Sequence, residues 1–127
     1  MAKDVFHDVV KRALQKMDKL ENYRRIIQDL LIKHSEQKLS YGDVDTEVIF
    51  DRERDRYQVV DVGWDANQFI YGCSIHIDIK NDKIWIQWNS TEDDIALDLV
   101  ALGVPKTDIV IGMHPPDLRK FTEYAVG

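Results

Sequence analysis

No glycine or proline occurs before Gly42, so the first third of the chain lacks the residues that most often interrupt a helix. Apolar residues in this stretch recur at steps of three and four, or at their sum, which places them on one side of an α-helix. They are Phe6, Val10, Ala13, Met17, Leu20, Ile27 and Leu31. The pattern predicts a long N-terminal helix of about thirty residues, or two helices with a bend near Met17.

Strand-like runs rich in β-branched and aromatic residues follow at 46–51, 56–64, 69–80 and 83–88. The segments between them are too short for a crossover, which takes about a dozen residues or more. Neighbouring runs are therefore expected to pair antiparallel. The last connection is the two-residue pair Asn81-Asp82, a common hairpin turn.

The remaining segment contains short elements. Ser90 or Thr91 is expected to cap a helix that Gly103 ends, because hydroxyl side chains accept from the first helical N–H groups and glycine closes helices readily. A short strand at 109–111 and a brief helix at 115–121 follow. The expected fold class is α+β: a long N-terminal helix packed on an antiparallel meander sheet of about four to five strands, with a C-terminal helix, a short strand and a short helix.

A candidate interaction face follows from strand register. The two-residue turn fixes the pairing of the last two runs, so His76 is expected to face Gln87. One face of the sheet then carries isoleucines that pack on the helix, and the other carries polar and aromatic side chains. If Trp64 faces Phe69 across the preceding turn, residues of the second run join this other face. The candidate residues are Tyr57, Asp61, Ser74, His76, Asp78, Trp85 and Gln87.

Three interpretations of this face remain open. Trp85 and Tyr57 could anchor a protein partner, since Trp and Tyr are enriched where binding energy concentrates. His76 and Asp78 could bind a metal ion or act in catalysis, although two residues fall short of the three or four ligands of a zinc site. The face could also be an ordinary solvated sheet surface with cross-strand polar pairs.

Sequence signatures of common enzyme classes are missing. The chain has no glycine-rich phosphate loop, no G-x-S-x-G and no H-E-x-x-H. Cys73 falls on the strand parity expected to face the core, where a small buried side chain is more common than a nucleophile. We therefore predict no catalytic residue, no metal site and no cofactor.

Charge is distributed unevenly along the chain, whose formal net charge is -6. Residues 1–38 contain nine Lys and Arg against six Asp and Glu, and residues 39–127 contain eight against seventeen. DNA binding needs clustered basic residues, so direct DNA contact is disfavoured and would have to use residues 3–25. The acidic remainder suits a basic partner. A homo-oligomer is also expected, because apolar residues lie opposite the isoleucines at Val48, Phe50 and Val59.

Cellular location follows from cysteine content and hydropathy. Cys73 is the only cysteine, so no disulfide forms within one chain, as is usual in the reducing cytosol. The N-terminus lacks the apolar core of a signal peptide, and no stretch approaches the roughly 18–20 apolar residues that span a bilayer. We expect a cytoplasmic protein without membrane contact.

Several ordered runs from Met17 onward are specific enough to indicate a family. The most specific are Ile49-Phe50-Asp51, Val62-Gly63-Trp64-Asp65, Tyr71-Gly72-Cys73, His76-Ile77-Asp78-Ile79-Lys80, Lys83-Ile84-Trp85-Ile86-Gln87 and Gly103-Val104-Pro105-Lys106. They resemble the XisI-like family, named for an fdxN element excision controlling factor. The resemblance covers residues 17–127 and leaves 1–16 as an N-terminal helical extension. It departs at Trp88-Asn89-Ser90, where the family has His-Asp-Gly, and at Asp94, where it has Gly.

The resemblance implies a cyanobacterial, non-enzymatic accessory factor needed for site-specific excision of a DNA element. Such a factor would act by binding an XisH-like protein, which resembles nucleases. No catalytic residues are established for the family, so none are assigned here by resemblance. Two alternatives remain: a weak DNA-binding protein that uses its N-terminal helix, and a metal-dependent hydrolase or nuclease component that uses Asp61, His76, Asp78 or Glu92.

Overall fold

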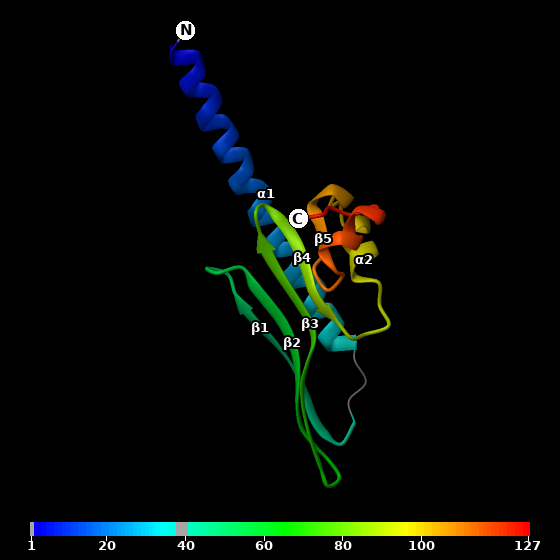
Figure 1. Ribbon diagram of the computed structural model, residues 1–127. Coiled ribbons are helices and arrows are strands. Elements are labelled where there is room, and N and C mark those ends of the chain that lie inside the picture. The colour runs from blue at the N-terminus through cyan, green and yellow to red at the C-terminus, as the bar shows by residue number, and fades with distance from the viewer. Residues whose placement is uncertain (1, 38–40) are drawn as a thin grey trace.

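The structure, a computed structural model, describes residues 2–37 and 41–127. Its elements are α1 (Ala2–Gln37), β1 (Asp43–Asp51), β2 (Arg56–Asp65), β3 (Gln68–Lys80), β4 (Lys83–Asn89), α2 (Ile95–Ala101) and β5 (Ile109–Ile111), with 3₁₀ turns at Lys106–Asp108 and Pro116–Phe121. The expected α+β fold is confirmed. Figure 1 shows α1 crossing one face of the sheet, with α2 and the C-terminal turns gathered beside β4 and β5.

α1 is one unbroken helix, so the alternative of two helices with a bend near Met17 is wrong. Its apolar stripe meets two different environments. Tyr23, Ile27 and Leu31 are buried against the sheet, and burial of each such side chain contributes about 1.5–3 kcal/mol. Residues 5–18, in contrast, are all exposed. The N-terminal part of α1 extends past the end of the sheet (Figure 1).

The sheet has the strand order β1-β2-β3-β4-β5. The first four strands form the expected antiparallel meander, and β5 pairs with β4 in parallel after the chain has crossed through α2. The sheet is therefore mixed. In the β3–β4 hairpin, Ile79 pairs with Ile84. Asn81 and Asp82 have φ angles of 52° and 63°, the left-handed backbone that a two-residue hairpin turn requires.

A β-bulge in β3 changes which face of the sheet nearby residues occupy. Val59 pairs with Ile75 and Val60 with Cys73, so Ser74 is an extra residue in β3. Side chains alternate between faces along a strand, and one extra residue reverses the expected faces beyond it. The residues expected opposite the isoleucines therefore pack in the core with them. They are Val48, Phe50 and Val59.

A second bulge lies in the pairing of β3 with β4. His76 pairs with Trp88, and not with Gln87 as the uninterrupted register predicts. The pairing of Ile77 with Ile86 follows the expected register, so Gln87 is the extra residue.

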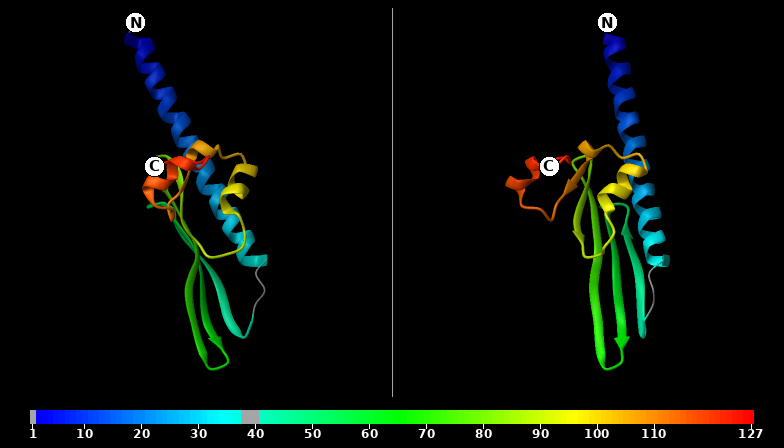
Figure 2. Two further views of the ribbon diagram at one scale, coloured as in Figure 1. Left: turned by 45° about the vertical axis from the view of Figure 1, so that its right-hand side comes forward. Right: turned by 90° about the vertical axis from the view of Figure 1, so that its right-hand side faces the viewer.

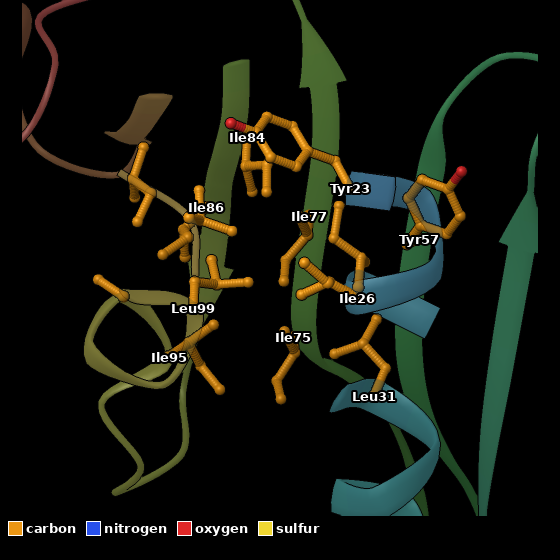
Figure 3. Close-up of a cluster of buried hydrophobic side chains, with 14 of the residues drawn as sticks. Tyr23, Ile26, Leu31, Tyr57, Ile75, Ile77, Ile84, Ile86, Ile95 and Leu99 are labelled. Carbon is orange, nitrogen blue, oxygen red and sulfur yellow. The ribbon is translucent and has the colours of Figure 1, made fainter. Parts of the chain in front are cut away.

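The core lies between α1 and one face of the sheet, here called the inner face. Figure 3 shows Tyr23, Ile26 and Leu31 of α1 pointing toward the isoleucines of β3. Two residues of α2, Ile95 and Leu99, complete the core beside β4 (Figure 3). No helix within residues 2–37 or 41–127 is long and apolar enough to cross a membrane.

α2 begins later in the chain than expected. Its cap is Asp94, and not Ser90 or Thr91, because the Asp94 carboxylate accepts a hydrogen bond from the Leu97 N–H at 3.0 Å. Asp94 is one of the positions at which the chain departs from the family pattern, and here it has a structural role.

Candidate interaction surface

The residues expected to form one interaction face lie in three different places. Those on the outer face of the sheet, opposite α1, are His76, Asp78, Trp85 and Gln87. Tyr57 lies in the core, while Asp61 and Ser74 line a crevice near the C-terminal end of α1. The expectation of a single continuous face is therefore wrong, and the bulge at Ser74 is the cause.

A hydrogen-bonded cluster, here called the His76 cluster, lies on the outer face across β2, β3 and β4. Nε2 of His76 lies 2.8 Å from Oδ1 of Asp78, and Oδ2 of Asp78 accepts from Nε2 of Gln87 at 3.2 Å. Nδ1 of His76 lies 3.2 Å from Nε2 of Gln58. Because an amide nitrogen only donates, this contact assigns the imidazole hydrogen to Nε2, facing the carboxylate. Nε of Arg56 is 3.7 Å from the same carboxylate.

The His76 cluster presents an ordered polar surface. The side chain of Asp78 is only 9% exposed and both of its oxygens have partners, whereas the side chain of His76 is 29% exposed. In the part of the chain that the structure describes, no three His, Cys, Asp or Glu side chains are placed to share a metal ion. Side chains already held in one geometry lose little freedom on binding, so this arrangement suits recognition by hydrogen bonds.

Trp85 lies on the outer face but is covered by residues of its own chain. Its indole N–H donates to the carbonyl of Lys80 at 3.1 Å. The ammonium of Lys80 lies 4.4 Å from the ring centroid, and the guanidinium of Arg119 lies 5.2 Å from it. Only 8% of Trp85 remains exposed, so its expected role as an anchor for a partner is wrong.

Tyr57, the other expected anchor, is completely buried. It pairs with Ile77 across the strands and therefore points to the inner face. Its ring packs at 5.7 Å from that of Phe50. Tyr57 belongs to the core and offers no surface to a partner.

Trp88 is the aromatic residue that the outer face does expose beside the His76 cluster. It is 48% exposed and pairs directly with His76. Sequence reasoning singled it out only as a departure from the family pattern. Side chains alternate between faces along a strand, and this alternation could have assigned a face to Trp88. The bulge at Gln87 interrupts the alternation, so the face of Trp88 could not be predicted from it.

The crevice that contains Asp61 and Ser74 has a volume of about 550 Å³. Its rim includes His34, whose Nδ1 lies 3.1 Å from a carboxylate oxygen of Asp93. Glu92 also lines it. The residues named for a hydrolase or nuclease thus lie on opposite faces of the sheet, with Asp61 and Glu92 in the crevice and the His76 cluster on the outer face. They do not form one reaction centre.

A second aromatic group lies on the outer face of the β2–β3 hairpin and is here called the hairpin patch. It consists of Trp64, Phe69 and Tyr71, which are 53%, 52% and 74% exposed. Trp64 pairs with Phe69 as expected, and their rings meet edge to face with centroids 5.2 Å apart. The patch is separated along the strands from Trp88, which lies opposite His76.

Comparison with known proteins gives concordant results. The model of the XisI protein family matches residues 17–126. A crystal structure of a XisI-like protein from Anabaena variabilis ATCC 29413 is 42% identical in sequence with a TM-score of 0.82, and the match covers 85% of this chain and 99% of that one. No curated protein matches the sequence.

A crystal structure of the fdxN element excision controlling factor XisI from the same organism is also similar. It is 35% identical with a TM-score of 0.76, and the match covers 86% of this chain and 99% of that one. Nearly the whole of each relative is therefore matched, while part of this chain has no counterpart in either. The family match begins at Met17, so residues 1–16 lie outside it.

Proposed function

The chain belongs to the XisI protein family, and on this premise we propose that it is a non-enzymatic controlling factor in excision of a DNA element that acts by binding another protein. The observation that carries the proposal is the His76 cluster beside exposed Trp88. Together, His76, Asp78, Gln58, Gln87 and Trp88 are here called the contact surface.

The contact surface has the composition of a binding site for a protein. Trp88 supplies apolar area at a cost of few rotatable bonds, and Trp is enriched among residues that dominate binding energy. Gln58 and Gln87 keep donors and acceptors near the surface, where an interface forms about one hydrogen bond per 100–200 Å². His76 and Asp78 fix the geometry beneath them.

The charge of the chain supports a basic partner. Residues 39–127, a range that includes the sheet and the C-terminal elements, contain eight Lys and Arg against seventeen Asp and Glu. Such a surface attracts a basic protein and accelerates their encounter. A nuclease-like protein of the XisH type, whose DNA-binding surface must be basic, fits this requirement. The acidic chain would then cover that surface.

Calorimetric titration of the protein with an XisH-like partner tests the proposal. We expect a complex at micromolar concentration, and its affinity should fall as salt is raised. Trp88→Ala should weaken binding by about tenfold or more, the loss of ~1.4 kcal/mol that separates a dominant contact from a peripheral one. Phe121→Ala is the matched control, because Phe121 is 77% exposed on the C-terminal 3₁₀ turn, outside the contact surface.

Two results would overturn the proposal. One is the absence of a complex at micromolar concentration when both proteins are folded. The other is equal loss of affinity in the Trp88 and Phe121 variants, since binding would then not depend on the contact surface.

A further inference from the structure

We infer that the protein forms a reciprocal dimer in which the N-terminal part of α1 from one copy packs on the hairpin patch of the other. Residues 5–17 of α1 are here called the arm. This inference goes beyond the proposed function and does not depend on it, because it uses neither Trp88 nor the His76 cluster.

The arm exposes an apolar stripe. Phe6 is 72% exposed, Leu14 55% and Met17 64%, with Val5, Val9 and Val10 also exposed. These side chains together present roughly 500 Å² of apolar surface, which is as large as the largest patch on a typical monomer. Such a patch marks a site of association or a liability for aggregation.

The stripe continues a surface that already packs on a sheet. Further along the same helix, Tyr23, Ile27 and Leu31 are buried on the inner face of the sheet of their own chain. The arm repeats this spacing of three and four residues, so its surface has the same chemistry and periodicity. α1 is unbroken from Ala2 to Gln37, and a straight helix cannot turn back onto its own sheet. A second copy of the chain can supply a sheet on which the arm packs.

The hairpin patch complements the arm in both apolar surface and charge. Its aromatic rings form an apolar surface on the outer face of the β2–β3 hairpin, on the side of the sheet opposite α1. The neighbouring exposed residues of β1 are acidic: Asp43 pairs with Trp64, and Asp45 and Glu47 follow on the same face. Within the arm, basic residues outnumber acidic ones by three to one, and one of the three, Lys16, pairs with Asp82 of its own chain. The apolar stripe of the arm is thus flanked by basic residues and the hairpin patch by acidic ones, so their contact pairs opposite charges. Pairing of two arms would instead bring like charges together.

The positions of the two surfaces favour a closed pair. Figure 2 shows the arm leaving the body of the molecule at one end and the β2–β3 hairpin extending from the other end. In two copies related by a two-fold axis and running in opposite directions, each arm meets the hairpin of its partner. Two such contacts would bury on the order of 1,500 Å² in total, the size of a standard specific interface.

Light scattering on the full chain at micromolar concentration tests this inference. The expected mass is twice that of the 14.8 kDa chain. The arm variant Phe6→Asp with Val10→Asp and the hairpin variant Phe69→Asp with Tyr71→Asp should each weaken the dimer by about tenfold or more. Leu97→Asp is the matched control, since Leu97 is an exposed apolar residue of α2 outside both surfaces. Circular dichroism should show that all variants are folded.

Mixing the two variants distinguishes this arrangement from others. The hairpin variant retains an intact arm and the arm variant retains an intact hairpin patch, so one of the two contacts forms again. We expect a heterodimer that is weaker than the wild-type dimer and stronger than either variant alone. A monomeric wild-type chain would overturn the inference. So would an unchanged dimer in the hairpin variant, which would indicate pairing of arm with arm, or a mixture that stays monomeric.

Discussion

Tyr57 donates the hydrogen of its hydroxyl to Oδ1 of Asp55, 3.0 Å away, although its ring is completely buried. The same carboxylate accepts two hydrogen bonds from Arg24 of α1, at 2.7 Å and 3.2 Å. Asp55 lies in the turn between β1 and β2, with a φ of 57°. This arrangement satisfies the polar end of a core tyrosine and joins the turn to the helix.

Removing the Asp55 carboxylate should therefore destabilise the fold strongly. In Asp55→Ala, the hydroxyl of Tyr57 loses its partner and the half-buried guanidinium of Arg24 keeps only its 3.4 Å contact with Glu21, which should cost about 2–3 kcal/mol of unfolding free energy. Tyr57→Phe removes one hydrogen bond and keeps the ring, so it should cost about 1 kcal/mol. Urea denaturation measures both. Equal losses in the two variants would contradict a shared role for the carboxylate.

Stability should fall in alkaline solution. Burial, together with the hydrogen bond to Asp55, raises the pKa of Tyr57 above its ordinary value, and burial with the bond to Asp108 raises the pKa of Tyr23 in the same way. The unfolded chain ionises at a tyrosine pKa of about 10. The stabilisation is therefore fully present below that pH and is lost as pH rises toward the higher folded values.

Denaturation midpoints measured from neutral to strongly alkaline pH test whether stability falls as pH rises. Tyr57→Phe and Tyr23→Phe should each reduce the alkaline loss of stability, even though both start from a lower stability at neutral pH. Stability that rises between pH about 9 and 11 in the wild type would contradict the argument.

Gly63 is required by the pairing of β1 with β2. Its φ is 148°, and a Cβ there would lie 2.0 Å from the backbone oxygen of Asp43. Gly63→Ala should cost more than about 2 kcal/mol, because backbone strain and a steric clash add together. Gly72→Ala is the matched control in the neighbouring strand, where nothing lies within 4 Å of the added atom. Thermal denaturation should show a large decrease in midpoint for the first variant and a small change for the second.

Arg119 should hold the C-terminal segment over Trp85. Its guanidinium donates to the carbonyl of Gly112 at 3.1 Å and to that of His114 at 3.2 Å, and it lies over the Trp85 ring. Arg119→Ala should therefore make Trp85 more accessible to a fluorescence quencher and cost about 1–2 kcal/mol. Lys120→Ala, at the adjacent exposed position, should change neither quantity. Unchanged quenching in the Arg119 variant would show that the segment stays in place without it.

The repeating features of the fold could be predicted from the sequence. The stripe from Leu20 to Leu31 required a helix with one buried side, and Asn81-Asp82 fixed the register of Ile79 with Ile84. Both follow from local periodicity and turn chemistry, which the residues themselves encode. The parallel pairing of β5 with β4 depends on how a crossover packs, and local patterns do not specify this.

The candidate surface was predictable only in part, because the two bulges have no clear local signal. Ser74 as an extra residue sends Tyr57 to the core and Asp61 to the crevice, and Gln87 as an extra residue brings Trp88 beside His76. The pair of His76 with Asp78 was found because residues two apart on a strand share a face. The covering of Trp85 by Arg119 arises from a contact distant in sequence.

We propose that a partner protein covers the outer face of the sheet at Trp88. Hydroxyl-radical footprinting of the chain, with and without an XisH-like protein, measures this directly because oxidation follows side-chain exposure. Trp88 is 48% exposed in the free chain. Its rate of oxidation should fall several-fold in the complex, because a residue that anchors an interface becomes buried there. Phe121, 77% exposed outside the contact surface, should react equally in both samples. Protection of Phe121 with Trp88 unchanged would contradict the claim.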